Sequence, residues 1–389
     1  MKDKKKLLAM MLVLVTFFFT ACEDDDSNSG FDPEQAKTII TSLPTMMGTQ
    51  MGDIMRSEGL QTFDILIDAP YPFGTSNKKS IFNKINKLIS PNSYVNKELL
   101  QTKDADPGFD FNARKGTYTY VHTPQPHWDV QLGGQKIIIL FPSDSTNMST
   151  NNATFTIHGY TETQITVATA GGTITLYQPT AIDADLVVDG TTLLDVDITS
   201  SWIASGENAG TLTSLNANLS LTPYQITAAV QLSPNNSISI NINITQNDNT
   251  IILVEGSMIP STDTTIMFNG IEGRLTIGDL SFRANINASM INQAIDSLSN
   301  NPEKLVEYVN TQLSVGLYQN DVKVADIKIM PLESVPTGAI YPFDIVFMLS
   351  DESTITALPT ILMLYQTMNE FLALSDLLDL EEDNDGFHP

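Results

Sequence analysis

The chain has 389 residues, of which 45 are acidic and 20 are basic, so its formal net charge at pH 7 is −25. This charge argues against nucleic acid and anionic lipid headgroups as partners, because both need a basic surface. With 42% hydrophobic residues and 17 phenylalanines, the chain can bury a substantial core, which excludes a wholly disordered protein.

The N-terminus has the layout of a secretory signal peptide. Four lysines within residues 2–6 precede fifteen uncharged residues, Leu7–Ala21. That run is shorter than the roughly 20 apolar residues that a membrane-spanning helix needs. We expect residues 1–21 to be removed, which leaves 16 basic and 44 acidic side chains and a net charge of −28.

The only cysteine of the chain stands directly after this segment. Phe19, Thr20, Ala21 and Cys22 resemble the lipobox of a bacterial lipoprotein signal. The resemblance implies that the signal peptidase cuts before Cys22, which then carries fatty acyl chains such as palmitate. One acyl chain holds a protein to a membrane only marginally, whereas several, at about 0.8 kcal/mol per buried methylene, hold it stably. The alternative is an ordinary secretory signal with an incidental cysteine.

Four acids, Glu23, Asp24, Asp25 and Asp26, follow the cysteine. They resemble the export signal of Bacteroides-type surface lipoproteins, which implies an outer-membrane protein that faces the cell exterior. A block of like charges also repels itself, so residues 22–30 are expected to form an extended acidic and serine-containing tether. The two interpretations are compatible.

From residue 31 to about residue 110 the apolar residues recur at helical spacing, which predicts a helical cap. Asp32, Pro33 and Glu34 have the pattern of a helix start. Pro44 is expected to separate the first helix from a second one. The methionine-rich stripe of this region could be a ligand-binding face, but packing against a sheet is the favoured interpretation.

Over residues 111–287 the period changes to two, which predicts a β-meander. Asp189 and Gly190 suit a tight turn between strands at 184–188 and 192–196. Strands that succeed one another without intervening helices are expected to be antiparallel. The other expected strands lie at 117–121, 136–141, 153–157, 164–167, 212–221, 224–232, 237–244 and 251–255.

Residues 288–389 are expected to add helices and closing strands. The helices are predicted at 288–298 and 302–313, and the strands at 313–318, 322–329 and 343–349. We interpret residues 355–380 as a C-terminal helix, or as a buried strand followed by a helix.

The predicted fold class is therefore α+β and mostly antiparallel β. A long twisted or half-barrel meander would pack against N-terminal, mid-chain and C-terminal helices, with residues 31–389 as a single large domain. Residues 186–259 also resemble the tandem strand units of uncharacterised Bacteroides-type lipoproteins, which implies a topology but no activity.

The chain lacks the glycine-flanked serine of hydrolases, the HExxH zinc motif, the P-loop and the dinucleotide fingerprint. No catalytic residue and no cofactor is predicted. His122 and His127 could form a zinc pair, but the sequence offers no third ligand, and the alternative is a pair of residues at a hairpin rim. Paired catalytic carboxylates of a glycosidase remain possible, because the separation of two acids cannot be judged from the sequence.

Four aspartates lie on the two strands of the predicted hairpin: Asp183, Asp185, Asp195 and Asp197. Calcium could relieve their mutual repulsion. Their period-two spacing favours the simpler interpretation that they face solvent.

Three short sequences, Asp144-Ser145-Thr146, Asp263-Thr264-Thr265 and Asp296-Ser297-Leu298, resemble the O-glycosylation acceptors of exported Bacteroides-type proteins. Ser145 and Thr264 fall in expected loops and are the candidate sites. Ser297 falls near the end of a predicted helix and is expected to stay unmodified.

Three functions fit these observations. The first is a non-enzymatic surface lipoprotein that binds a glycan or an envelope protein, with exposed Tyr118, Tyr120 and Trp128 as stacking platforms. The second is a carrier of lipid or another apolar ligand in a curved-sheet cleft, similar to the half-barrels of outer-membrane lipoprotein carriers. The third is a hydrolase with an unrecognised site. We favour the first, and the shape of the sheet is the observation that distinguishes the three.

Overall fold

The computed structural model of the protein describes residues 30–68, 108–169, 172–206, 209–234, 237–260, 268–298, 301–331, 343–357 and 359–360. This part of the chain contains five helices and sixteen strands. The helices are α2 (Pro33–Met55), α3 (Glu58–Asp68), α6 (Phe111–Arg114), α7 (Ala288–Leu298) and α8 (Pro302–Thr311).

The strands follow one another across the sheet in chain order, except that β2 lies outside β1. They are β1 (Gly116–Val121), β2 (His127–Leu132), β3 (Ile137–Phe141), β4 (Ala153–Thr169), β5 (Gly172–Val188), β6 (Thr191–Trp202), β7 (Leu212–Leu221), β8 (Tyr224–Leu232), β9 (Ile238–Gln246), β10 (Asn249–Pro260), β11 (Phe268–Ile277), β12 (Leu280–Ile286), β13 (Leu313–Gln319), β14 (Val322–Pro331), β15 (Phe343–Met348) and β16 (Thr354–Thr356).

The predicted α+β class with a mostly antiparallel meander is confirmed. The parallel pair β1–β3 is an exception to the antiparallel pattern. The sheet is not closed, because β2 and β16 stand at the two ends of the strand order.

The described part of the chain divides into two compact units, one formed by residues 30–51 and those from 230 onward, the other by residues between 52 and 229. In the second of these units, strands β1 to β7 place apolar side chains on one face of the sheet, here called the core face. One row of cross-strand partners illustrates the apolar composition of the core face. Every residue of this row is buried except Val130, which stands at the end of the row. The row runs Val130, Tyr118, Ile139, Phe155, Leu186, Leu194 and Leu221.

Helix α3 packs on this core face. The rings of Phe63 and Phe155 lie 5.4 Å apart between centroids. Gly59 makes the close approach possible, because a Cβ at that position would lie 2.8 Å from the carbonyl oxygen of Leu193 and 2.7 Å from Leu221 Cδ1. A side chain of any size at residue 59 would therefore push α3 away from β6 and β7.

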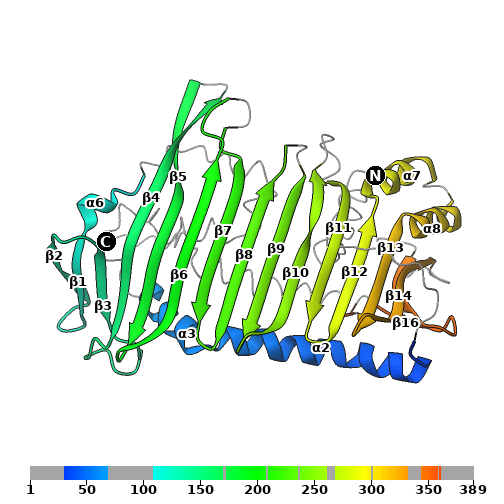
Figure 1. The fold of residues 1–389 in the computed structure, drawn as a ribbon, viewed down its shortest axis with the longest axis horizontal. Coiled ribbons are helices and arrows are strands. Elements are labelled where there is room, and N and C mark those ends of the chain that lie inside the picture. The colour runs from blue at the N-terminus through cyan, green and yellow to red at the C-terminus, as the bar shows by residue number, and fades with distance from the viewer. Residues whose placement is uncertain are drawn as a thin grey trace, which may run out of the picture. The chain divides into compact units, whose positions relative to one another are not determined.

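In the other unit, α7 and α8 pack against the sheet near β11 and β14 (Figure 1). Both helices begin and end close to the predicted residues. Asn301 caps α8 by accepting a hydrogen bond from the Lys304 backbone N–H, and Pro302 stands in the first turn. No helix within the described residues is long and apolar enough to cross a membrane.

The tight turn predicted at Asp189-Gly190 is confirmed, and both residues have positive φ, 49° and 82°. This is the backbone that a two-residue primed turn requires. Positive φ values also occur at the residue pairs Asn247-Asp248 and Asn320-Asp321. There asparagine and aspartate adopt the left-handed backbone conformation.

Several sequence predictions were wrong in detail. Pro44 does not end the first helix, because α2 continues through it to Met55. The missing hydrogen bond is tolerated since the buried stripe of Ile40, Leu43 and Met47 continues on both sides of the proline. The strands predicted at 153–157 and 164–167 are one strand, β4, which tolerates two register shifts instead of breaking.

At the C-terminal end, residues 354–356 form strand β16, so the predicted helix cannot begin at residue 355. The alternative, a strand before a helix, agrees with β16 as a strand, but two of its three residues are exposed and not buried. The rest of the segment to residue 380 lies almost wholly outside the described residues. Strands β2, β11 and β12 were not predicted.

Candidate functional site

Most of the predicted surface signals lie outside the described residues. These are the lipidation site Cys22, the acids Glu23, Asp24, Asp25 and Asp26, and the glycosylation candidate Thr264.

The predicted stacking platform is wrong for its two tyrosines. Tyr118 is 2% exposed and Tyr120 is 5% exposed, because both belong to the core face of β1. The Tyr118 hydroxyl donates a 2.8 Å hydrogen bond to the carbonyl of Arg114, and burial raises the pKa of this phenol. Neither ring is available to stack on a sugar.

Trp128 is the half-buried member of the predicted trio. Its ring meets Tyr120 edge-on, with centroids 5.3 Å apart and an interplanar angle of 64°. The tryptophan therefore covers the end of the core at the point where β2 begins.

Strand β2 is an edge strand that pairs with β1 alone among the described strands (Figure 1). Five of its six residues are exposed. The β1–β2 pairing runs without a register shift from Gly116–Leu132 to Val121–His127. The strand contains no proline and no lysine, which are two of the residues that commonly protect an open edge.

The hydrogen-bonding direction of β2 follows from its last bond to β1. The Gly133 N–H donates to the Lys115 carbonyl at 2.8 Å. Because backbone groups alternate in direction along a strand, Gln131 and Asp129 also point toward β1. The backbone groups of Val130 and Leu132 consequently point toward the open edge.

The side chains of β2 continue the core face of the sheet beyond its buried part. Val130 lies opposite Tyr118, and Leu132 lies opposite Gly116. Yet Val130 is 49% exposed and Leu132 is 64% exposed. The edge thus combines outward backbone donors and acceptors with an exposed apolar stripe, which is the chemistry that receives an added strand.

The histidines beside β2 do not form a metal site in the described part of the chain. His127 contacts the Gln125 carbonyl through Nδ1 at 2.8 Å, and its Nε2 lies 3.5 Å from Asp129. The His122 ring lies 6.4 Å from that of Tyr120. No group of three or more metal-ligating side chains gathers among the described residues.

The four hairpin aspartates lie directly opposite one another on β5 and β6, Asp183 with Asp197 and Asp185 with Asp195. Three are exposed, as their period-two spacing predicts, and Asp185 is half-buried. His158 lies 3.0 Å from the Asp185 carboxylate. His158 is therefore the side chain that contacts the Asp185 end of the row.

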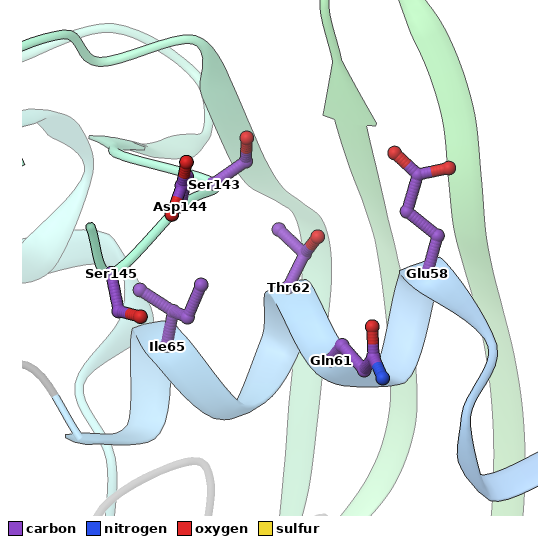
Figure 2. A pocket seen from close by; sticks show the side chains of 7 residues that line it. All are labelled: Glu58, Gln61, Thr62, Ile65, Ser143, Asp144 and Ser145. Carbon is purple, nitrogen blue, oxygen red and sulfur yellow. The ribbon is translucent and has the colours of Figure 1, made fainter. Parts of the chain in front are cut away.

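A polar pocket of about 420 Å³ opens between α3 and the loop after β3 (Figure 2). Its walls were not predicted to form a site, apart from the glycosylation candidate Ser145. The lining side chains are Glu58, Gln61, Thr62 and Ile65 of α3 and Ser143, Asp144 and Ser145 of the loop.

Asp144 in this pocket is held in its own turn. Its Oδ1 accepts hydrogen bonds from the Thr146 backbone N–H at 2.8 Å and from the Thr146 hydroxyl at 2.7 Å. These bonds lower the pKa of the Asp144 carboxyl, so the group stays ionised and is unsuited to act as a general acid. Ser145 is exposed beside it, as a modification site requires. Ser297 is also exposed on α7, where its hydroxyl donates to the Gln293 carbonyl at 3.0 Å.

Comparison with models of known protein families, with curated proteins and with solved structures finds no match for this chain. The interpretation of its sites therefore depends on the geometry described above.

Proposed function

We propose that the protein is a non-enzymatic lipoprotein of the outer membrane, anchored through lipidated Cys22 and facing the cell exterior, and that it binds another envelope protein through the open edge of β2. The geometry of β2 supports the binding surface, because among the described strands it pairs with β1 alone, and it exposes Val130 and Leu132. The anchor and its orientation rest on the lipobox and on the acids from Glu23 to Asp26.

The partner would add an extended strand to β2. Main-chain hydrogen bonds to Val130 and Leu132 supply the affinity in this mode of recognition. Alternate side chains of the incoming strand would cover Val130 and Leu132 on the core face. The glycan alternative is weaker, since Tyr118 and Tyr120 are buried and so cannot provide the aromatic surface on which it depended.

Hydrogen exchange tests this proposal. Peptides that cover residues 127–133 are compared between the purified lipid-free chain at high dilution and the protein in native outer-membrane vesicles. We expect the amides of Val130 and Leu132 to exchange rapidly in the dilute chain and slowly in the vesicles, because an added strand bonds them. The amide of Gly133, which already donates to Lys115, is the internal control. Equal exchange of residues 130 and 132 in both samples would contradict the proposal.

A second candidate function, binding of an apolar ligand, is favoured by the middle of the sheet in the other unit. Ile240 and Ile242 of β9 are half-buried, as is Val254 of β10. In contrast, Leu275 and Phe282 of β11 and β12, which lie in the same row as Ile242 and Val254, are each 1% exposed. Native mass spectrometry of the purified Cys22→Ala chain tests this candidate, which requires a lipid or similar molecule to remain bound.

A further inference from the structure

We propose that the strand added to β2 is β2 of a second copy of this chain, paired antiparallel to form a symmetric homodimer. This inference rests on the proposed function, since it names the partner of the same edge. A two-fold symmetric dimer requires a surface that is complementary to itself. The sequence of β2 meets that requirement in one register.

In this register Val130 stands opposite Val130 of the second copy. Trp128 then faces the second copy's Leu132, and Asp129 faces its Gln131. Apolar side chains meet apolar ones on the core face, whereas on the other face a carboxylate meets an amide that can donate to it. Asp129 does not face Asp129 of the second copy, so the register places no like charges directly opposite each other.

The backbone groups agree with the same register. Val130 and Leu132 point their N–H and C=O groups toward the open edge, by the alternation that the Gly133–Lys115 bond establishes. Val130 and Val130 of the second copy would therefore form a hydrogen-bonded pair. A shift of the register by one residue would turn the apolar stripe of one copy toward the polar side of the other.

The pairing also completes the apolar row of the core face. That row passes from buried Phe155 through Ile139 and Tyr118 to Val130, which is 49% exposed. In the dimer the row continues through Val130 into the second copy, and the exposed stripe of Val130 and Leu132 is covered. Anchoring of both copies in one membrane would raise their effective concentration.

The charge of the chain opposes this association. Two mature chains each carry a net charge of −28 and repel one another through water. At physiological ionic strength, salt largely screens the repulsion between exposed charges that are more than about 8 Å apart. The homodimer should therefore become tighter as salt rises, whereas a complex with a basic partner would become weaker.

Sedimentation of the mature Cys22→Ala chain at several concentrations tests the inference. We expect a monomer–dimer equilibrium that shifts toward dimer at high salt. Val130→Lys places two cations opposite each other and should weaken the dimer by about tenfold or more. Gln131→Lys is the matched control, because its ammonium would face Asp129 of the other copy and the dimer should persist.

Cross-linking supplies a second measurement if Val130→Lys disturbs the fold. In the Cys22→Ala background Val130→Cys introduces the only thiol, and a Cα–Cα distance of about 5.5 Å in a hydrogen-bonded pair lets a short thiol cross-linker join the two copies. Asn218→Cys, on the exposed side of β7, is the control and should not cross-link. A monomer at all concentrations, or a dimer unaffected by Val130→Lys and not joined through Val130→Cys, would overturn the homodimer. Protection of the Val130 amide in native vesicles would still uphold the proposed function in that case.

Discussion

Gly59 offers a direct test of how α3 is seated on the sheet. Replacement by alanine adds a Cβ that would lie 2.8 Å from the Leu193 carbonyl oxygen and 2.7 Å from Leu221 Cδ1. The carbonyl belongs to the backbone of β6 and also accepts a hydrogen bond from the Thr222 N–H, so it cannot move freely. Overpacking of this kind costs about 1–3 kcal/mol, whereas alanine in a helix gains at most about 1 kcal/mol over glycine.

We therefore expect Gly59→Ala to lower the free energy of unfolding by a net amount of up to about 2 kcal/mol, measured as a lower urea midpoint for the transition of this unit. Gly48→Ala is the matched control, because Gly48 is an exposed glycine of α2 with no atom within 4 Å of the added Cβ. That variant should raise stability by about 0.5–1 kcal/mol. Stabilisation by both substitutions would refute the close approach of α3 to β6 and β7.

Three further predictions concern the exported protein. Cys22→Ala should release the protein from the membrane fraction, and a variant that still resists carbonate extraction would contradict lipidation. Alanines in place of residues 23–26 should leave acylation intact but protect the protein from protease added to whole cells, while equal cleavage of both forms would reduce the acids to a spacer. Intact-mass measurement from the native host should show glycans that Ser145→Ala and Thr264→Ala remove and Ser297→Ala does not. An unmodified mass, after allowance for the lipid, would contradict glycosylation.

Local signals in the sequence predicted the turn at Asp189-Gly190 and the antiparallel meander of most strands. Asp189-Gly190 has few alternatives to a primed turn, and the asparagine and aspartate pairs at the other hairpins act by the same backbone preference. Pro44 misled the prediction because tertiary burial of Leu43 and Met47 outweighs the local cost of a proline in a helix. Strand β11 was missed because Gly273 interrupts the apolar alternation of Ile271, Leu275 and Ile277.

The candidate site was less predictable from sequence. Alternation in residues 117–121 indicates that Tyr118 and Tyr120 share a face, but the pattern alone does not say whether aromatic side chains on that face are buried or bind a ligand. The alternating Trp128, Val130 and Leu132 were a usable signal for β2. Whether such a strand is central or at an edge depends on its neighbours, and β1 pairs with β3 in parallel through a connection that the sequence does not mark.

Site-specific photocross-linking in living cells tests most directly whether β2 is the binding surface. A photoreactive residue at Leu132, which is 64% exposed, should give a discrete cross-linked product, and Val130→Pro should abolish it. This proline removes only an N–H that points away from β1, so the β1–β2 ladder should survive. The mass of the product identifies a second copy or another envelope protein. Absence of a product from Leu132, or a product that persists with Val130→Pro, would contradict binding through this edge.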